Sequence, residues 1–257
     1  MLWNYLGNSD NCAAGGFTLD YGPFGFIEMF DPKFQPWTSG GMHFSFFNQP
    51  VAAQKNFKSF CSALKPLLNS NKEALEELEK IENNFSKIMQ EKMEDMWTKK
   101  LGINKFDVEL FEELINLMIE TKVDYTIFFR ELSNIPDDIS SLEKSFYGNL
   151  QNENIKSRWN IWLEKWKSNI NVNDEKSKEQ LSNQMKLTNP KYTLREWHLV
   201  WAYQEAQNGN YEPVHELQKI MTNPYEEQTK EIEEKYYIKK PSDFFGIAGI
   251  SHVSCSS

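Results

Sequence analysis

The sequence predicts a mainly α-helical fold with a short β-hairpin near the N-terminus. From Val51 onward, apolar residues recur at steps of three and four, which is the spacing of one face of a helix. The segment before it is instead rich in glycine, proline and aromatic residues. Within that segment, the pair Gly15-Gly16 is followed by Phe17-Thr18-Leu19, whose apolar, polar, apolar order is typical of a short half-buried strand.

Composition places the chain among globular proteins. Its 257 residues are 40% hydrophobic and 25% charged, which is enough apolar material for a sizeable core. The net charge of −9 argues against non-specific binding to nucleic acid or to anionic membrane surfaces. No apolar run reaches the length of about 18 residues that a membrane span needs. We therefore expect neither nucleic acid nor a membrane as a partner.

The helical part begins where the turn-rich part ends. We therefore divide the chain into residues 1–50 and residues 51–257, with one continuous domain as the alternative. Pro66 is expected to kink or end the first helix. Residues 168–183 are polar and predict a surface connection that runs into a helix. Helices are expected over residues 51–68, 75–96, 107–118, 124–132, 157–166, 192–208 and 212–221.

Two stripes of large side chains invite functional interpretation. Trp159, Trp162 and Trp166 fall on one helix face, and this spacing is more typical of a core than of a base-stacking platform. Met89 and Met93 lie on the apolar face of the second helix, which favours packing over a partner groove. Arg195 could reach a phosphate, but a structural ion pair is the favoured interpretation.

Three side chains near the N-terminus could handle a metal ion and a proton. Asp10, Asn11 and Asp20 lie within eleven residues, around the glycine pair. Mg²⁺ prefers oxygen ligands and usually keeps one or two protein ligands, and an amide carbonyl with a carboxylate is such a pair. A second carboxylate beside them could accept the proton of an attacking hydroxyl. This pattern suits metal-assisted transfer from a nucleotide.

The same residue types also form ordinary turns. Asp, Asn and Gly are the usual residues of a tight hairpin, so the segment could be structural only. His43, in the aromatic-rich loop region nearby, is expected to be a hydrogen-bonded structural residue although its unshifted pKa suits proton transfer. That loop region could either shape an acceptor site or cap the core.

Further motifs extend the pattern over nearly the whole chain. They are Asn8-Ser9-Asp10-Asn11, Gly16 to Phe26 with Asp20-Tyr21-Gly22, Asp31-Pro32, Asn48-Gln49-Pro50, Asp124 to Arg130, Asn189-Pro190-Lys191-Tyr192 with Arg195, Asn223-Pro224-Tyr225 with Gln228, and the tail Val253 to Ser257. Together these motifs resemble the selenoprotein O family, whose members are protein adenylyltransferases with a pseudokinase fold.

The resemblance implies an activity and roles for three residues. Asp10 would be the catalytic base, and Asn11 and Asp20 would hold Mg²⁺, with Mn²⁺ as an alternative. Asp20 would also contact the nucleotide. The reaction would transfer AMP from ATP to a Ser, Thr or Tyr hydroxyl of another protein. In this family the nucleotide lies flipped relative to a kinase, which presents its α-phosphate to the acceptor.

The resemblance also implies a fold. It is the C-lobe of a protein-kinase-like fold with a C-terminal helical extension, in which residues 1–50 hold the catalytic loop, the metal-binding hairpin and an activation-segment-like region. A glycine-rich loop and a Lys–Glu pair would precede Asp10, so we expect this chain to be the C-terminal part of a longer protein without its N-lobe. The resemblance implies a mitochondrial location if the protein comes from a eukaryote and a cytoplasmic one otherwise.

The cysteines leave an alternative function open. Three cysteines without a metal-binding spacing favour a reducing compartment, with Cys12 and Cys61 as small core residues. Cys255 lies among serines near the end of the chain, and the resemblance implies a redox role for it. The loop after Tyr21-Gly22 carries no partner cysteine, which puts an internal disulfide in doubt. The alternative to catalysis is a truncated, inactive helical module that binds a partner or senses redox state through Cys255.

Overall fold

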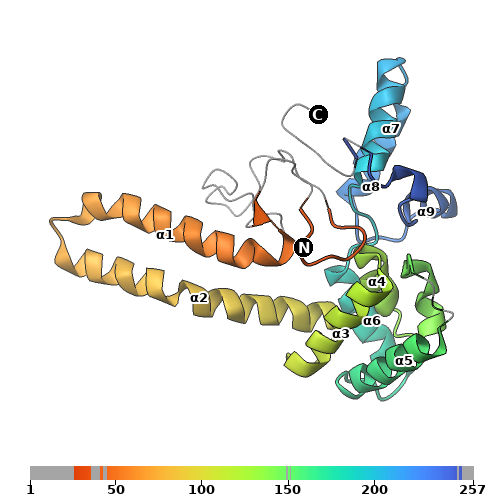
Figure 1. Ribbon diagram of the computed structural model, residues 1–257, viewed down its shortest axis with the longest axis horizontal. Helices are drawn as coiled ribbons and strands as arrows, with labels where there is room; N and C mark the ends of the chain where they lie inside the picture. Colours follow the sequence, from red (N-terminus) through yellow and green to blue (C-terminus); the bar gives the residue numbers. More distant parts are fainter. Residues whose placement is uncertain are drawn as a thin grey trace. The chain divides into compact units, whose positions relative to one another are not determined.

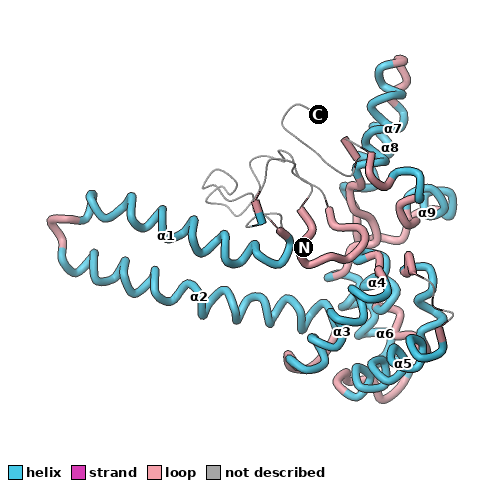
Figure 2. Tube along the Cα trace, in the orientation of Figure 1, coloured by secondary structure: helices cyan, strands magenta, loops and turns pink. Residues whose placement is uncertain are grey.

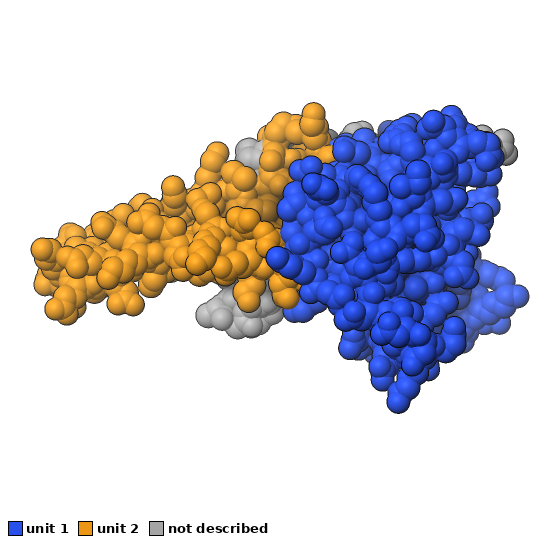
Figure 3. Space-filling view, turned by 90° about the horizontal axis from the view of Figure 1, so that it is seen from below, with its two compact units in different colours: residues 1, 26–31, 96–252 blue, residues 2–25, 32–95, 253–257 orange. Residues whose placement is uncertain are grey.

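The computed structural model describes residues 26–35, 41–42, 45–148, 150, 152–247 and 249–250, which are mostly helices joined by loops (Figure 1, Figure 2). The chain divides into two compact units, which Figure 3 shows in separate colours. Among the described residues, unit 1 holds residues 26–31 and 96–250, and unit 2 holds residues 32–95. The predicted division near residue 50 stays a prediction.

Unit 2 is a helical hairpin preceded by a short 3-10 helix, η3 (Phe46–Asn48). Its two long helices are α1 (Gln49–Leu68) and α2 (Lys72–Leu101), whose last residues, from Met96 on, belong to unit 1. The helices run antiparallel, side by side (Figure 1). The ring of Phe57 stacks on that of Phe85 at 4.8 Å, and Cys61 is fully buried.

The start and end of α1 follow from its sequence. Pro50 stands in the first turn, where a missing N–H group leaves no helical hydrogen bond unmade. Pro66 lies inside the last turn, and α1 ends two residues later at Leu68, as we expected of this proline. The methionine stripe of α2 is only half-buried at Met89 and Met93.

Unit 1 consists of shorter helices that pack on one another. The helices are α3 (Val108–Thr121), α4 (Tyr125–Leu132), α5 (Glu153–Ser168), α6 (Glu175–Thr188), α7 (Glu196–Gln207), α8 (Glu212–Thr222) and α9 (Lys230–Tyr236), with the 3-10 helices η4 (Ile139–Ser145) and η5 (Ser242–Phe244). None of the described helices has the length and apolar composition that crossing a membrane would require.

Side-chain caps define the starts of several helices. Asp107 and Asp124 accept hydrogen bonds from the backbone N–H groups of Leu110 and Ile127, each at 3.0 Å. These bonds satisfy N–H groups that have no partner within the helix. Both helix starts agree with the sequence-based prediction.

The tryptophan stripe of α5 forms the core of unit 1, as its spacing predicts. Trp159, Trp162 and Trp166 are almost completely buried. The indole Nε1 atoms of Trp162 and Trp166 donate to the carbonyl oxygens of Leu110 in α3, at 2.9 Å, and of Leu101 at the end of α2, at 2.7 Å. The indoles therefore satisfy backbone groups as well as filling the core.

The predicted start of α7 is wrong, and α5 begins four residues before the predicted range of 157–166. We expected a helix from Tyr192, but α7 begins at Glu196. The backbone N–H groups of Lys191 and Tyr192 both donate to the carbonyl oxygen of Pro224, at 2.8 and 3.1 Å. This distant carbonyl takes up N–H groups before the helix starts, so the chain stays extended up to Arg195.

The predicted fold class is also wrong. We expected a kinase-like C-lobe with a short β-hairpin, but the described residues contain no strand or sheet, only isolated bridges between Met29 and Asp124 and between Val123 and Phe146. Asp124 already caps α4, so the extended chain there is too short for a ladder of strand hydrogen bonds. The glycine pair and strand of the expected hairpin lie outside the described residues.

Gly102, after the end of α2, is predicted to be essential for packing against α6. Its φ is +66°, and an added Cβ would lie 2.5 Å from the Sδ atom of buried Met185. Gly102→Ala should therefore lower the free energy of unfolding by about 2–3 kcal/mol, from backbone strain plus repacking. Urea unfolding followed by circular dichroism measures the loss.

Gly209→Ala is the matched control. Gly209 has φ +85°, but nothing lies within 4 Å of the place that an added Cβ would take, so only the backbone strain of about 1 kcal/mol remains. Equal losses in the two variants would contradict a packing role for Gly102.

Candidate functional site

The residues predicted to carry the chemistry lie outside the described part of the chain. These are Asp10, Asn11, Asp20 and Cys255. His43 also lies outside the described residues. The structure does describe residues 26–31, which directly follow the predicted metal-binding motif. The site is therefore built here from the contacts that hold this segment.

Backbone hydrogen bonds fix the segment against the start of α4. The N–H group of Phe30 donates to the carbonyl oxygen of Val123 at 2.7 Å, and that of Tyr125 donates to the carbonyl oxygen of Glu28 at 2.8 Å. The ring of Phe30 stacks on that of Tyr125 at 5.8 Å. Both rings are buried, so the segment is part of the core of unit 1.

A buried ionic centre adds a second attachment. The guanidinium of Arg195 donates to both carboxylate oxygens of Asp124, at 2.8 and 3.0 Å, and to Oε2 of Glu28 at 2.9 Å. Arg195 is 2% exposed and Asp124 is fully buried. This bidentate geometry suits a guanidinium, and it confirms the expectation that Arg195 makes a structural ion pair.

Neutral donors complete the centre. The indole Nε1 of Trp197 donates to Glu28 at 3.1 Å, and the hydroxyl of Tyr147 donates to Asp124 at 3.0 Å. The Tyr147 oxygen in turn accepts from the backbone N–H group of Lys240 at 3.0 Å. Each buried carboxylate thus has several donors, which is what makes a buried charge tolerable. We call this set of residues the Arg195 centre.

The charges of the centre shift the pKa values of its members. Burial opposes the charge of Arg195, but the carboxylates of Asp124 and Glu28 outweigh burial and raise the pKa of the guanidinium. Burial and then the Asp124 charge raise the pKa of Tyr147, which keeps its phenol protonated as a donor. Burial and then the Glu28 charge raise the pKa of nearby Glu196 to about 7.

A second buried cluster surrounds Asn189, which is fully buried. Its Oδ1 accepts from the Nζ of Lys100 at 2.9 Å, and its Nδ2 donates to the carbonyl oxygen of Lys100 at 2.8 Å and to Oγ of Ser133 at 3.1 Å. The Nζ of Lys100 lies 4.2 Å from the ring centre of Phe129. Burial lowers the pKa of Lys100 to about 7.

Arg130 joins this cluster to the motif around Asn223. Its Nη1 donates to the carbonyl oxygen of Asn189 at 3.1 Å, and its Nη2 donates to Glu227 at 2.7 Å. Lys191 also donates to Glu227, and to Glu233 at 2.8 Å. Burial would raise the pKa of Glu227, but the hydrogen bonds from Lys191 and Arg130 lower it to about 2. The motif residues after Asp124 thus hold unit 1 together.

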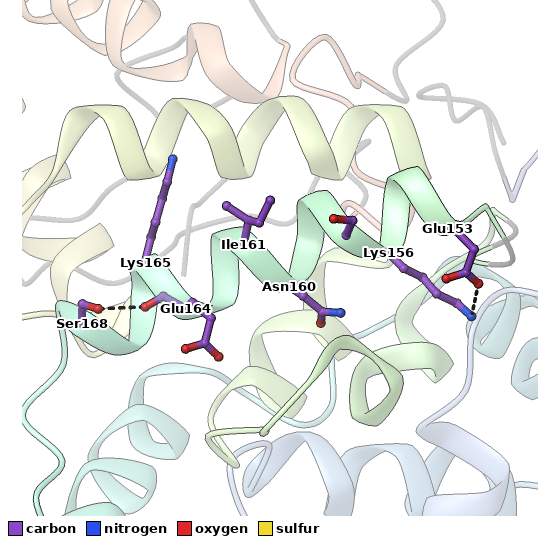
Figure 4. Close-up of a pocket in the computed structure, with 8 residues that line it drawn as sticks. Glu153, Lys156, Asn160, Ile161, Glu164, Lys165 and Ser168 are labelled. Atoms are coloured by element: carbon purple, nitrogen blue, oxygen red, sulfur yellow. Dashed lines mark hydrogen bonds and ion pairs between the residues drawn. The ribbon is translucent and has the colours of Figure 1, made fainter.

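The described residues lack a cluster of side chains that could hold a metal ion. They contain no group of three or more His, Cys, Asp or Glu side chains placed to hold a metal ion. Figure 4 shows a groove along α5, where Lys165 points toward α3 and pairs with Glu113 at 2.5 Å. Asn160 accepts from the backbone N–H group of Ile139 at 3.1 Å. These side chains tie α5 to its neighbours.

Sequence reasoning missed two contributors. Glu28 carried no signal, because a carboxylate between apolar residues has no local pattern that reveals a partner 167 positions away. Lys100 directly follows Lys99, and adjacent lysines are usually exposed to solvent, yet Lys100 is only 5% exposed. The signal that could have revealed its burial is its position at the C-terminal end of the apolar face of α2.

Comparison with known proteins now defines the class of the molecule. The family model described as "Protein adenylyltransferase SelO" matches residues 4–222. The chain belongs to this family. The match confirms the resemblance found in the motifs, and it includes Asp10, Asn11 and Asp20 but not Cys255.

Curated relatives carry the name protein nucleotidyltransferase YdiU. The relative from Flavobacterium johnsoniae is 32% identical over 97% of this chain and 49% of its own length. Those from Aromatoleum aromaticum and Vibrio parahaemolyticus are 32% and 31% identical, over 97% of this chain and 48% and 50% of their own lengths. The chain thus spans about half the length of the curated relatives it matches.

Removing the cation of the Arg195 centre should destabilise the folded protein strongly. Arg195→Met leaves Asp124 and Glu28 buried without their counter-charge, which typically costs about 3–5 kcal/mol of unfolding free energy. Urea unfolding followed by tryptophan fluorescence measures it.

Arg158→Met is the control, because Arg158 pairs with Glu120 at 2.7 Å while both side chains are more than 40% exposed. Exposed pairs contribute about 1 kcal/mol or less. A loss at Arg195 no larger than at Arg158 would show that the buried centre is not needed for stability.

Glu196 should make stability depend on pH. Its pKa is raised above the ordinary value of 4.5 to about 7, so the folded state holds a proton that the unfolded state releases first. Stability is therefore lost as the pH rises from about 4.5 through 7. Glu196→Gln should remove this loss and stabilise the protein at pH 8 relative to wild type, and less so at pH 5.

Urea unfolding at the two pH values measures this effect. Glu179→Gln, at an exposed position of α6, is the control and should change the free energy of unfolding at neither pH. An unchanged pH dependence in Glu196→Gln would contradict the assignment.

Proposed function

We propose that this chain carries the base and the metal-binding residues of a protein adenylyltransferase, which transfers AMP from ATP to Ser, Thr or Tyr hydroxyls of proteins. The observation that carries the proposal is the family match, because it begins at residue 4 and spans the whole Asp10 to Asp20 segment. The relatives' name, protein nucleotidyltransferase, supports the same reaction class.

The proposed reaction assigns one role to Asp10. The acceptor hydroxyl oxygen attacks the α-phosphorus of ATP while the carboxylate of Asp10 accepts the hydroxyl proton. A new phosphorus–oxygen bond to the protein forms, and the bond between the α-phosphorus and the bridging oxygen breaks. Pyrophosphate leaves with that electron pair.

The donor set of Asn11 and Asp20 fits Mg²⁺. An amide oxygen and a carboxylate oxygen are hard ligands, and Mg²⁺ usually takes only one or two such protein ligands together with phosphate and water. When bound, the ion would neutralise charge on the phosphates. The described residues supply no competing cluster of metal ligands.

The Arg195 centre supports the proposal by fixing the segment that comes after the motif. Glu28 and Phe30 lie within ten residues of Asp20 and are held by buried hydrogen bonds. A catalytic segment needs such attachment, because small displacements of reacting groups slow the reaction strongly. Three expectations stay predictions: a redox role for Cys255, the alternative function as a partner-binding helical module, and the cellular compartment.

Substitution of the proposed residues tests the function. Wild type and variants are incubated with Mg²⁺ and ATP labelled on the α-phosphate, and protein-bound label is counted. Asp20→Ala should abolish labelling, and Asp10→Ala should reduce it by about 100-fold or more with nucleotide binding retained.

Asp137→Asn, in an exposed bend, is the control and should leave labelling unchanged. If the chain alone takes up no label, the matching positions of the Flavobacterium johnsoniae relative are tested in the same way. Full labelling in the Asp20 variant would refute the metal assignment, and label from the γ-phosphate alone would indicate phosphoryl transfer.

A further inference from the structure

The helical hairpin of unit 2 leaves large apolar side chains in solvent. Phe60 and Leu67 of α1 are 51% and 77% exposed, and Ile81 and Ile88 of α2 are 49% and 47% exposed. Single exposed apolar residues are ordinary, but these four share one pattern. Within each helix the two residues are seven positions apart, so they lie on one face.

The two exposed stripes lie on the same side of the hairpin. Phe60 and Ile88 each come three positions after a residue that faces the other helix, because Phe57 and Phe85 stack on each other. In each helix the exposed residues therefore lie at the same angle about the helix axis from the side that faces the other helix, and this angle is turned in the same direction relative to the direction of the chain. Because α1 and α2 are antiparallel, equal rotations point to one side.

The stripes also have matching spacing. Both advance by alternating steps of three and four residues, which is the repeat of helices that pack along their length. The positions are Ala53, Asn56, Phe60, Ala63 and Leu67 in α1, and Ala74, Glu77, Ile81, Asn84 and Ile88 in α2.

We propose that this face of the hairpin, the stripe face, binds the same face of a second copy of the chain. A two-fold axis that runs between the faces, along the helices, lays α1 of each copy on α2 of the other, antiparallel to it. Every helix of the resulting four-helix bundle is then antiparallel to both of its neighbours. Two-fold symmetry makes each contact twice.

The symmetry fixes the register, because rotation about this axis leaves each residue at its height along the hairpin. Phe57 and Phe85 mark one common height, so Phe60 meets the partner's Ile81 near the centre. Toward the two ends, Leu67 meets Ala74 and Ile88 meets Ala53. A large side chain therefore faces a small one at both ends, which lets the two faces interlock.

The size of the face is adequate for a dimer. A 20-residue helix such as α1 is about 30 Å long, and two packed helices present a face about 20 Å wide. The projected area is thus about 600 Å² and larger once side chains are counted. Specific, stable interfaces bury about 600–1,000 Å² per partner, so the face lies at the lower end of this range.

Charge favours laying α1 on α2 over laying like helices together. Helix α1 carries Lys55, Lys58 and Lys65 and no acidic residue, whereas the facing part of α2 has more acidic than basic residues. Pairing α2 with α2 would oppose acidic helices, and pairing α1 with α1 would oppose basic ones. In the proposed register Asn56 faces the partner's Asn84, and the two amides can hydrogen-bond.

Sedimentation equilibrium of the full chain tests the proposal directly. We expect a mass of twice 30.2 kDa at micromolar concentrations. Phe60→Glu and Ile81→Glu, each tested alone, should weaken the dimer by about tenfold or more, because a charge would be buried at the centre of the interface. Ile161→Glu, at a site of 55% exposure on α5, is the matched control and should leave the mass unchanged.

Cross-linking tests the register. The proposed dimer brings Leu67 of each copy against Ala74 of the other, so the double variant Leu67→Cys, Ala74→Cys should form a disulfide-linked dimer under mild oxidation. The double variant Leu67→Cys, Ile88→Cys is the control. Its two positions lie roughly 20 Å apart along the hairpin, so it should form no more linked dimer than wild type.

The remaining outcomes overturn the proposal. A chain that stays monomeric at about 100 µM would show that the stripe face does not bind a second copy. Cross-linking in the Ile88 control but not in the Ala74 variant would show that the helices meet in another register. Loss of the dimer in Ile161→Glu would place the interface elsewhere.

Discussion

The burial of Arg195 between two carboxylates is the constraint on which unit 1 depends. Asp124 and Glu28 would be strongly destabilising in the core without a counter-charge, and Arg195 would be equally so without them. The three side chains come from segments that are far apart in the sequence. Because each of these buried charges must be paired, the pairing fixes residues 26–31, the start of α4 and the start of α7 in one arrangement.

Local signals predicted the helices well because they depend on nearby residues. The apolar spacing of α3 and α5 and the caps at Asp107 and Asp124 are all decided within one or two helical turns. The start of α7 was misplaced because the distant carbonyl of Pro224 captures the preceding N–H groups. The kinase-like fold with a β-hairpin was wrong, because neither a three-residue alternation nor a motif resemblance carries information on how long an extended segment pairs with another.

The candidate site shows a similar limit. An ion pair was expected for Arg195 from its chemistry, but its partners could not be named, because pairing across more than seventy residues leaves no local trace. Glu28 was missed for the same reason, whereas the position of Lys100 at the end of an apolar helix face did carry a signal. For Asp10, Asn11 and Asp20, which the structure does not describe, the family match is the support, and it works through similarity of sequence and not through geometry.

The distribution of tryptophan has a practical consequence for spectroscopy. Six of the eight tryptophans lie in unit 1, while Trp3 and Trp37 lie outside the described residues. The aromatic contact between α1 and α2 comes instead from phenylalanine, which emits weakly. Indole emission will therefore be dominated by unit 1, whereas far-ultraviolet ellipticity registers the helices of both units. A gap between the two melting curves would measure how independently the hairpin folds.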